Sequence, residues 1–378
     1  MSAEPGRRRL AVFLPSLAGG GAERTMVSLI GAIVERDLDV DLVLSAAEGP
    51  YLPDVPPRVR VVDLGASRVI TSAPALIRYL RRERPDALLT VLSHASLVGL
   101  VSRALARVPT RVAVLEQDTF SEVARETHRR RARLVPALAR LLYPRADAVV
   151  AVSTGVADDL ADVLGIARKR VSVVYNPVVR PEMAEAARRP APHPWLADGE
   201  PPVVIGIGRL QPRKKDFAAL IRAFADARGE TGARLMILGE GPERDNLEAL
   251  VADLGIREHV ALPGFVENPH AFLSRAALFV LSSQWEGLPT VLIEALFCGA
   301  PVVSTDCPSG PSEILADGEH GVLVPVGDQA ALASGIVDGL AGRIPKPEPE
   351  SWKPYELSTI ADRYVAVLFD DNGRSVGS

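Results

Sequence analysis

The sequence predicts an α/β protein made of two doubly wound domains in series. A chain of 378 residues is too long for one ordinary hydrophobic core, since domains of about 100 to 200 residues are usual. Short apolar runs rich in β-branched residues alternate with segments of helical period, which indicates parallel sheets covered by helices on both faces. A proline- and charge-rich segment at residues 180–201 divides this alternation and predicts an interdomain linker.

The first domain is predicted to span residues 1–179 and the second residues 202–345. The expected strands are, in chain order, 10–14, 40–44, 59–63, 87–91, 111–115, 148–152 and 171–174, then 203–206, 234–238, 260–262, 278–281, 302–304 and 321–324. The final segment, 346–378, ends in a helical pattern that we expect to pack back on the first domain. Doubly wound sheets bind ligands outside the carboxyl ends of their strands, so we predict a ligand cleft where the two domains face each other.

The opening of the chain allows two interpretations. Three arginines at positions 7–9, an apolar run and several small residues resemble a secretory signal. The same residues also fit a strand, a glycine-rich turn and the start of a helix. We favour the second interpretation because Pro15 and the glycines at 19–21 interrupt the apolar run, and because the alternation of strands and helices continues without a break.

The composition of the chain indicates its cellular compartment and the charge of its ligands. Two cysteines, Cys298 and Cys307, are too few for a disulfide framework, which favours a reducing, cytoplasmic location. The longest stretch without a formal charge, residues 87–102, contains hydroxyl side chains and a histidine and is a poor membrane span. Residues 1–178 carry 25 Lys and Arg against 19 Asp and Glu, so the first half should meet anions. We expect no nucleic-acid partner.

Signatures of two common nucleotide-binding classes are missing. The dinucleotide fingerprint G-x-G-x-x-G lacks its third glycine at residues 206–211 and again at 239–244, and no G-x-x-x-x-G-K-[ST] sequence exists. Hydride transfer and phosphate-loop chemistry therefore have little support. The six histidines show no H-E-x-x-H pattern. Residues 37–41 contain D-x-D, but they lead into the second strand at the end opposite the predicted cleft, so we predict no metal site.

Two glutamates follow the apolar run at 278–281. A helix should begin at Pro289 and end near Cys298, leaving the first backbone amides, at Thr290, Val291 and Leu292, available to an anion. Glu286 precedes this helix and Glu294 lies about 7.5 Å along it, so both carboxylates can accept hydrogen bonds from the hydroxyls of one ligand. The alternative is that Glu294 is a core-edge residue and Glu286 a solvated loop charge.

A basic loop follows the first strand of the second domain. Gly206 and Gly208 let backbone segments approach closely, and Arg209 and Lys214 can converge on a diphosphate. Arg213 and Lys215 are interpreted as the solvated members of the cluster.

The motifs GIGRLQPRK, LGEGPE, LPGFVENP and WEGLPTVLIEALFCGAPVVSTDCPSGPSEIL resemble those of retaining, GT-B-fold nucleotide-sugar glycosyltransferases of family 4, also called group 1. The match covers nearly all of residues 202–330, and it is thinner in the first half, at residues 16–24 and 175–178. The resemblance implies two Rossmann-like domains. It implies that Arg209 and Lys214 hold the donor diphosphate, that Glu294 binds the ribose and that Glu286 binds the donor sugar.

The same resemblance implies roles for several backbone segments. Residues Gly264, Phe265 and Val266 would meet the base, and the amides near Pro289, Thr290 and Val291 the sugar and phosphate. The loop containing Gly20 and Gly21 would close over the donor phosphate and the acceptor. The family's mechanism implies attack by an acceptor hydroxyl from the face that the nucleoside diphosphate leaves, with Glu286, Arg209 and Lys214 as the catalytic set. The nucleotide sugar is then a substrate and no cofactor is expected.

The sequence departs from the family at the residues expected to bind the acceptor. Many relatives carry a histidine in the loop after the fifth strand, in a run like E-H-N, whereas this sequence has Gln117 within E-Q-D. Gln117 can exchange hydrogen bonds with a sugar hydroxyl but does not titrate near neutral pH. His94, at the end of the fourth strand, is the second candidate for the acceptor pocket, with a purely structural histidine as the alternative.

Residues 123–145 form an arginine-rich amphipathic segment. Its apolar residues recur at helical spacing, and such a basic helix suits an anionic membrane surface on the inner face, where a lipid-linked acceptor would lie. A solvated packing helix is the alternative interpretation.

The leading prediction is an enzyme that moves a hexose or N-acetylhexosamine from a nucleotide diphosphate, most simply UDP, to a hydroxyl of a glycan, a glycolipid or a small natural product. A sugar-nucleotide 2-epimerase of similar fold is one alternative, although no set of general acid and base residues stands out. A nucleotide-sugar-binding subunit without turnover is the other.

Overall fold

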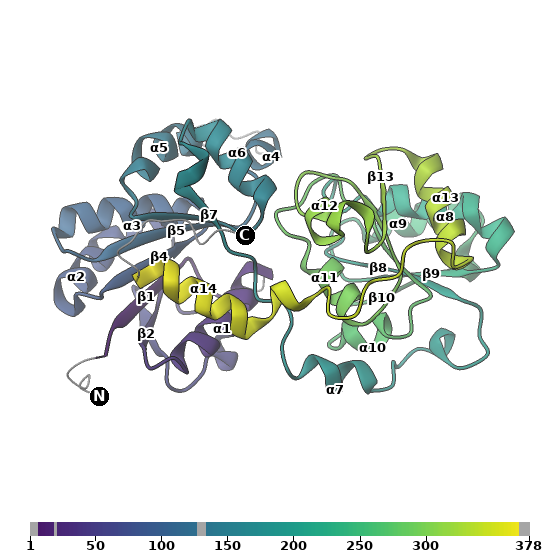
Figure 1. Cartoon of the computed structure of the whole chain (residues 1–378), viewed down its shortest axis with the longest axis horizontal. Helices are drawn as coiled ribbons and strands as arrows, with labels where there is room; N and C mark the ends of the chain where they lie inside the picture. Colours follow the sequence, from purple (N-terminus) through teal and green to yellow (C-terminus); the bar gives the residue numbers. More distant parts are fainter. Residues whose placement is uncertain (1–6, 19–20, 127–133, 370–378) are drawn as a thin grey trace. The chain divides into compact units, whose positions relative to one another are not determined.

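The computed structural model describes residues 7–18, 21–126 and 134–369, and these divide into two compact units (Figure 1). The first unit comprises residues 1–177 and 356–378, and the second residues 178–355. Each unit contains one parallel sheet with helices packed on its faces.

The first unit contains a seven-stranded sheet in the order β3-β2-β1-β4-β5-β6-β7, and every adjacent pair is parallel. The strands are β1 Arg9–Leu14, β2 Asp39–Leu44, β3 Arg60–Asp63, β4 Ala87–Val91, β5 Arg111–Glu116, β6 Ala148–Ala151 and β7 Val171–Val173. The α-helices are α1 Gly21–Val34, α2 Ala73–Glu83, α3 Ser93–Ala106, α4 Phe120–Glu126, α5 Leu134–Leu142, α6 Thr154–Leu164 and α14 Leu357–Phe369. Short 3₁₀ turns occur at η1 Leu52–Asp54, η2 Val69–Ser72, η4 Tyr143–Arg145 and η5 Arg168–Arg170.

The second unit contains a six-stranded sheet in the order β10-β9-β8-β11-β12-β13, also parallel throughout. Its strands are β8 Val203–Ile207, β9 Arg234–Leu238, β10 Val260–Gly264, β11 Leu278–Leu281, β12 Val302–Thr305 and β13 Val322–Val324. Its α-helices are α7 Met183–Arg188, α8 Phe217–Thr231, α9 Arg244–Asp253, α10 Pro269–Leu273, α11 Thr290–Phe297, α12 Pro311–Ile314 and α13 Gln329–Leu340. Its 3₁₀ turns are η6 Pro194–Leu196, η7 Arg257–His259, η8 Ala316–Gly318 and η9 Lys353–Tyr355.

The predicted fold class, two doubly wound α/β domains, is confirmed. The strands follow the predicted apolar runs closely, and most of their residues are buried because helices cover both faces of each sheet. In the second unit one core cluster joins β8, β9 and β11 to α8 and α13 through Val204, Phe224, Leu235, Val280 and Ile336. Burial of these apolar side chains is the main favourable term in folding.

The segment predicted to be a linker, residues 180–201, is part of the second unit. Its helix α7 packs against α10, where the Asn268 side-chain amide donates to the Ala186 carbonyl at 2.8 Å and the Ser274 hydroxyl donates to the Ala187 carbonyl at 2.8 Å. The guanidinium carbon of Arg234 lies over the ring of Trp195, 4.9 Å from the ring centroid. This segment is therefore held along its length and is not a loose tether.

The C-terminal helix α14 belongs to the first unit and packs along α1 (Figure 1). Arg36, just beyond α1, pairs with Asp362 at 2.5 Å and donates to the Ser358 carbonyl at 2.7 Å. No helix of the described residues is both long and apolar enough to cross a membrane.

The strand order places the two ligand-binding edges. In each sheet the order reverses next to the first strand of its unit, between β1 and β4 in the first and between β8 and β11 in the second. In open parallel sheets the loops at the carboxyl ends of these central strands diverge and leave room for a ligand. The residues that follow β1, β4, β8 and β11 are therefore the ones that the fold presents to ligands.

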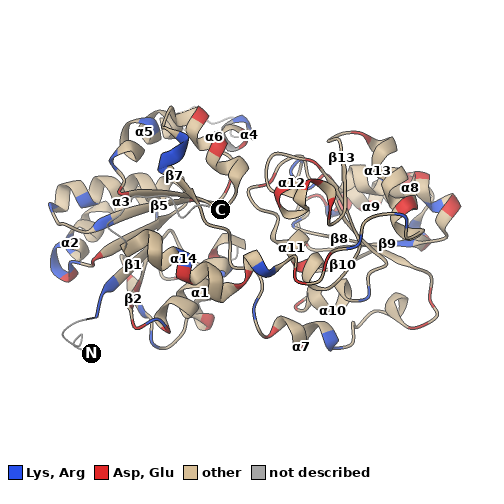
Figure 2. Cartoon of the chain, viewed as in Figure 1, with Lys and Arg blue, Asp and Glu red and all other residues tan. Residues whose placement is uncertain are grey.

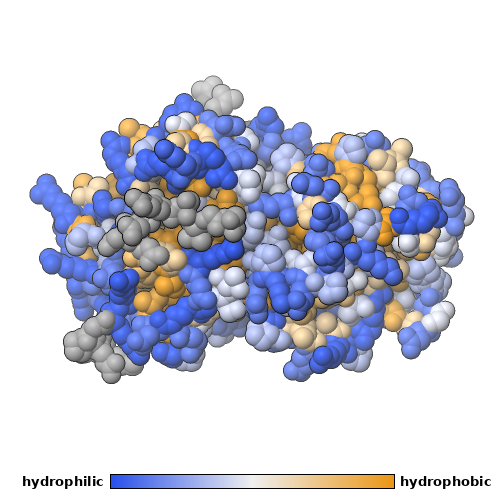
Figure 3. Space-filling model, in the orientation of Figure 1, coloured by the Kyte–Doolittle hydropathy of each residue, from blue (hydrophilic) through white to orange (hydrophobic). Residues whose placement is uncertain are grey.

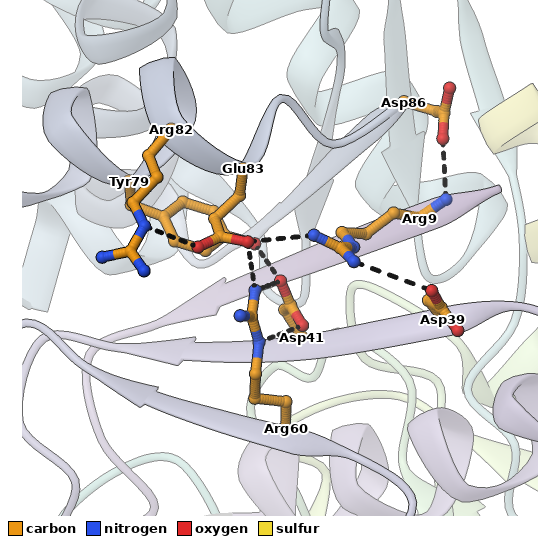
Figure 4. Close-up of polar contacts among 8 residues, drawn as sticks. All are labelled: Arg9, Asp39, Asp41, Arg60, Tyr79, Arg82, Glu83 and Asp86. Carbon is orange, nitrogen blue, oxygen red and sulfur yellow. Dashed lines mark hydrogen bonds and ion pairs between the residues drawn. The ribbon is translucent and has the colours of Figure 1, made fainter. Parts of the chain in front are cut away.

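An ion-pair network occupies the opposite, amino-terminal edge of the first sheet (Figure 4). Asp41 is buried in β2, where it accepts hydrogen bonds from Arg60 Nε at 2.8 Å and from the Tyr79 hydroxyl at 2.6 Å. Glu83 joins the network by pairing with Arg9 and Arg60, each at 2.9 Å. Burial raises the pKa of Tyr79, so it stays protonated and donates. The D-x-D sequence at residues 39–41 thus serves folding.

Replacement of Tyr79 by Phe should lower the free energy of unfolding by about 1–3 kcal/mol, because the buried Asp41 carboxylate loses one of its donors. Urea unfolding of Tyr79→Phe beside Tyr51→Phe, a partly buried tyrosine of the same unit, measures this difference. Equal stability of the two variants would contradict a structural role for the Tyr79 hydroxyl.

Candidate functional site

Two loops at the carboxyl edge of the second sheet are joined by hydrogen bonds. The loop after β8 carries Lys214 and Lys215, and the loop after β11 carries Gln284. The Gln284 amide donates to the Lys214 carbonyl at 2.8 Å, and the Ser282 hydroxyl donates to the Lys215 carbonyl at 2.8 Å. The basic loop and the glutamate loop, far apart in sequence, therefore form one surface at the switch point of the sheet.

Glu286 is a buried carboxylate at the centre of this surface. Its Oε1 accepts hydrogen bonds from Lys215 Nζ at 2.6 Å and from the Ser283 hydroxyl at 2.6 Å, and its side chain is only 7% exposed. Burial by itself would raise the pKa of Glu286. The charges of Lys215 and Lys214 and the two hydrogen bonds outweigh this effect and hold the pKa below its ordinary value, so the group is an anion at neutral pH.

The sequence interpretation of Lys215 as a solvated cation is wrong, because its side chain is 15% exposed and pairs with Glu286. A charge four-fifths removed from water needs a partner, and Glu286 supplies it. Likewise, Glu286 is not a solvated loop charge. Lys214 is partly buried and close enough to lower the pKa of Glu286, whereas Arg209 and Arg213 are exposed.

A third loop fixes the backbone on either side of Glu286. The Glu286 amide donates to the Pro308 carbonyl at 2.7 Å, and the Ser309 amide donates to the Glu286 carbonyl at 3.0 Å. Gly310 has a φ of 101°, and a Cβ there would lie 2.6 Å from Pro289 Cδ. The loop after β12 thus packs against the loop after β11 so closely that only glycine fits at Gly310.

Glycines bring the carboxyl ends of β8, β9 and β10 together. The Gly208 amide donates to the Leu238 carbonyl at 3.0 Å, and the Gly239 amide donates to the Gly264 carbonyl at 2.8 Å. A Cβ on Gly239 would lie 1.9 Å from the Gly208 carbonyl oxygen, so no side chain is possible there. Gly206 has a different role, since it lies within β8 beneath Leu220 of α8.

Helix α11 begins at Thr290 with Pro289 as its capping residue, one position later than predicted. Thr290 and Val291 are its first two residues, and Leu292 donates its amide to the Pro289 carbonyl at 3.0 Å. The prediction that the Leu292 amide is available to a ligand is therefore wrong, because the tight first turn uses it.

Glu294 lies on α11 beside a histidine that sequence reasoning missed. His270 of α10 is buried, and its Nε2 lies 4.0 Å from Glu294 Oε1. In the sequence His270 stands as a single histidine after Asn268 and Pro269, and this pattern is too common to indicate a functional residue. Three residues were expected to contact the nucleotide base. Gly264 is the last residue of β10 and has a φ of 91°, and the next two residues are Phe265, which is 74% exposed, and Val266, which is partly buried.

The predicted acceptor residues lie at the carboxyl edge of the first sheet. His94 is the second residue of α3, after β4, and burial lowers its pKa, so the imidazole is neutral at pH 7. Gln117 directly follows β5 and accepts a hydrogen bond from the Asn176 side chain at 3.0 Å. Gly21 is the first residue of α1, while Gly20 lies outside the described residues.

Glu116, the residue before Gln117, connects the loops after β4 and β5 and was not singled out from the sequence. It is buried at the end of β5, where its carboxylate accepts hydrogen bonds from the Tyr143 hydroxyl and, at 2.9 Å, from the Ser93 hydroxyl. Burial raises the pKa of Glu116 to about 7, although both hydrogen bonds oppose the shift. Ser93 precedes His94, so one buried carboxyl group connects the loops that carry His94 and Gln117.

No group of three or more side chains suited to holding a metal ion occurs among residues 7–18, 21–126 and 134–369. Both cysteines are free, and burial raises the pKa of each thiol to about 12, so neither is a reactive thiolate at neutral pH.

Comparison with known proteins covers both units. A family model described as "Glycosyl transferases group 1" matches residues 188–356, and one described as "Glycosyltransferase Family 4" matches residues 19–180. The N-acetylgalactosamine-N,N'-diacetylbacillosaminyl-diphospho-undecaprenol 4-alpha-N-acetylgalactosaminyltransferase of Campylobacter jejuni is 30% identical over 342 residues, which cover 87% of this chain and 89% of the relative. The chain belongs to the group 1, family 4 glycosyltransferases.

Solved structures show that this glycosyltransferase has the GT-B fold. The lipopolysaccharide outer core galactosyltransferase WaaB superposes with a TM-score of 0.74 at 18% identity, over 96% of this chain and 100% of that one. Anabaena Alr3699/HepE, solved in complex with UDP and glucose, superposes with a TM-score of 0.74 at 20% identity, over 95% of this chain and 98% of that one. Each of the two sheets therefore forms the centre of one Rossmann-like domain of the glycosyltransferase.

The contribution of Glu116 to the stability of the glycosyltransferase should fall as pH rises from about 4.5 to about 7, because folded Glu116 keeps its proton up to about pH 7 whereas unfolded Glu116 loses it near 4.5. Above this window both states are ionised and the penalty is constant. Glu116→Gln should remove this contribution to the pH dependence of stability. The melting temperature of the variant minus that of the wild type should therefore be larger at pH 8 than at pH 5.

The matched control is Glu48→Gln, at an exposed carboxylate of the same unit. A pH dependence of Glu116→Gln identical to that of the wild type and of the control would show that Glu116 does not titrate in this range.

Proposed function

We propose that the protein is a retaining, metal-independent glycosyltransferase that moves a hexose or N-acetylhexosamine from a UDP-sugar to a hydroxyl of a lipid-linked glycan. The observation that carries the donor half of this proposal is the buried Glu286–Lys215 pair at the carboxyl edge of the second sheet, with Lys214 beside it. An anionic acceptor of hydrogen bonds next to two cations suits a ligand that carries hydroxyls at one end and a diphosphate at the other.

The family resemblance supplies the role proposed for each donor-binding residue. Glu286, held ionised, accepts hydrogen bonds from sugar hydroxyls, and Glu294 accepts them from the ribose. Lys214 and the exposed Arg209 bind the diphosphate, together with the first amides of α11. The exposed Phe265 and the backbone of Gly264 and Val266 meet the base. UDP is favoured because Alr3699/HepE, of the same fold, was solved with UDP and glucose.

In the proposed reaction the acceptor oxygen forms a bond to the anomeric carbon on the face from which the diphosphate departs. The bond between that carbon and the diphosphate oxygen breaks, and the departing diphosphate takes the proton of the acceptor hydroxyl. Retention of configuration follows because attack and departure share one face. The protein contributes positioning and cationic stabilisation of the leaving charge, so Arg209 and Lys214 act when negative charge develops.

Metal independence is proposed because the basic loop supplies the positive charge that a diphosphate needs. Arg209 and Lys214 of this loop are the cations proposed to meet the diphosphate. The D-x-D sequence at 39–41 is engaged at the amino-terminal edge of the first sheet, where Asp41 binds Arg60 and Tyr79. Turnover should therefore persist in excess chelator.

The acceptor is proposed to bind the first unit, at the edge that carries His94 and Gln117. A neutral imidazole and a carboxamide exchange hydrogen bonds with hydroxyls and carry no charge. Gln117 replaces a titrating histidine, so its role is to bind. A glycolipid acceptor is favoured by the similarity to a glycosyltransferase named for a diphospho-undecaprenol acceptor and to a lipopolysaccharide galactosyltransferase. We place the enzyme at the inner face of the membrane on the same ground.

Product analysis tests the reaction. The protein is incubated with a panel of UDP- and other nucleotide-linked sugars, with chelator present, and the released nucleotide and the new glycoside are followed by NMR. A glycoside with the donor's anomeric configuration is expected. An inverted glycoside would exclude retention, an epimerised sugar nucleotide would indicate the 2-epimerase, and tight binding without any product would indicate a binding subunit.

Glu286→Gln should reduce turnover of the preferred donor about 10- to 100-fold, since a charge-assisted hydrogen bond contributes about 1.5–3 kcal/mol. The variant also leaves Lys215 without its anion, so its melting temperature is measured in parallel. Undiminished turnover by a folded Glu286→Gln variant would remove Glu286 from the site.

Arg209→Ala should weaken UDP binding about 10-fold or more through loss of a charged contact to the diphosphate, measured by calorimetry. Arg213→Ala is the matched control, because Arg213 is an exposed arginine of the same loop. Equal UDP affinity of the two variants would contradict the role of Arg209.

A further inference from the structure

Several polar features of the chain have no role in the proposed reaction. One is the basic segment that the sequence predicts as a single helix over residues 123–145. That prediction is wrong, because the described residues of the segment lie in α4, α5 and η4, and residues 127–133 lie outside the described residues. Another is His270, a buried histidine of α10 that lies beside Glu294, the residue proposed to bind the ribose.

Glu294 is a charged residue in an otherwise apolar helix. The sequence of α11, TVLIEALF, contains no other charged side chain, and four of its apolar residues are buried: Leu292, Ile293, Ala295 and Leu296. Charged residues are frequent on the helices and loops of the molecule (Figure 2), and the surface in view is mostly hydrophilic (Figure 3). The Glu294 side chain is only 14% exposed. A carboxylate so far withdrawn from water depends on nearby polar groups for its charge and its orientation.

His270 approaches Glu294 from the neighbouring helix. The residue is 4% exposed, and its Nε2 lies 4.0 Å from Glu294 Oε1. This separation is longer than a hydrogen bond, but at low exposure it allows a favourable interaction between the carboxylate and an N–H group of the ring. A carboxylate accepts and an imidazole Nε2–H donates, so a small rotation of either side chain would complete a hydrogen bond. The ring therefore favours some orientations of the Glu294 carboxylate over others.

Contacts on two sides of α10 fix the position of the histidine. On one side α10 packs against α7, where the Asn268 side-chain amide donates to the Ala186 carbonyl at 2.8 Å. On the other side the thiol of Cys298, which directly follows α11, donates to the His270 carbonyl at 3.7 Å. Burial and, after it, the charge of Glu294 raise the pKa of this thiol. The backbone of His270 is thus tied to the end of the helix that carries Glu294, close to the carboxylate.

We propose that His270 is a positioning residue, which holds the Glu294 carboxylate in the orientation that accepts hydrogen bonds from the ribose hydroxyls of the donor. The inference rests on the proposed function, because the contact between Glu294 and the ribose belongs to it. His270 acts through Glu294 and does not bind the ligand itself. Hydrogen bonds to a carboxylate weaken steeply when their angles are poor, so loss of the histidine should weaken recognition of the ribose without removing the carboxylate.

The relative affinity for UDP and for 2′-deoxy-UDP, measured by calorimetry on the full-length protein, tests the proposal. The wild type should bind UDP about 10-fold more tightly than 2′-deoxy-UDP, because the deoxynucleotide lacks one hydroxyl that donates to a charged acceptor. Glu294→Gln should lower this ratio to about 3-fold or less. His270→Phe, which keeps a ring and removes its nitrogens, should lower the ratio by a similar factor.

His270→Gln is the conservative variant. The side-chain amide of glutamine can donate from a position close to that of Nε2, so this variant should restore most of the ratio that His270→Phe loses. A histidine that only fills space would not be rescued in this way. A ratio no higher in His270→Gln than in His270→Phe would therefore contradict a donor role for the histidine.

His259→Phe is the matched control. His259 is a partly buried histidine of the same unit, but it directly precedes β10 and so lies at the amino-terminal edge of the sheet, away from the donor loops. Its variant should keep the wild-type ratio. Arg209→Ala should weaken the binding of both nucleotides and also keep the ratio, because Arg209 is proposed to contact the diphosphate that the two ligands share.

Two outcomes would overturn the proposal. The first is a wild-type ratio in a folded His270→Phe variant, or an equal loss in His259→Phe. The second concerns the combined variant of His270→Phe and Glu294→Gln, whose ratio should be no lower than that of Glu294→Gln alone, since the histidine acts through the carboxylate. A further, additive loss would give His270 a role of its own.

The same titrations separate this inference from the proposed function. A wild type that binds no UDP, or that binds both nucleotides equally, would refute the donor role of Glu294 and the inference with it. A ratio that depends on Glu294 but not on His270 would refute the inference alone. Should His270→Phe unfold, side-chain NMR of isotope-labelled histidines in the wild type replaces it. The His270 resonance should shift with UDP and less with 2′-deoxy-UDP, and equal shifts or none would overturn the proposal.

Discussion

The ion pair between Glu286 and Lys215 organises the loops at the carboxyl edge of the second sheet. It joins two loops that are more than seventy residues apart in sequence, and it lies where burial would otherwise neutralise the carboxyl group. A buried pair of this kind contributes less to net stability than to defining one arrangement of the groups around it. Backbone hydrogen bonds between the same loops, and from the loop after β12, hold that arrangement, so Glu286 is oriented before any ligand arrives.

The two units use the same topology to different chemical ends. At the edge of the second sheet, cations and an ionised carboxylate gather around the loops that follow β8 and β11. At the edge of the first sheet the ends of β4 and β5 are followed or formed by a neutral histidine, a carboxamide and a glutamate whose pKa lies near neutrality. Charged groups suit a diphosphate and neutral hydrogen-bonding groups suit hydroxyls, so the side chains that each sheet presents are consistent with the proposed donor and acceptor sites.

The fold could be predicted from the sequence because strand positions depend on local apolar runs, and runs such as 87–91 and 234–238 coincide with β4 and β9. The sequence pointed to the loops after β8 and β11, but it did not predict that Lys215 pairs with Glu286. Which of two adjacent lysines turns inward depends on the backbone path of the loop, where Arg213 and Asp216 both adopt positive φ, and no sequence period encodes that path. Glu116 and His270 were missed because single polar residues beside apolar runs are common, and only burial reveals them.

The second unit is inserted within the sequence of the first. The segments that enter and leave the second unit are hydrogen-bonded to each other, because the amides of Val178 and Val179 both donate to the carbonyl of Tyr355. Helix α14, which covers α1, is the last described element of the chain. On the ribosome, α1 and β1 are made early but their covering helix emerges only after the inserted unit has been synthesised. The unit whose synthesis begins first is therefore completed last. Until α14 is made, the apolar surface of α1 that it covers is exposed, and exposed apolar surface promotes aggregation.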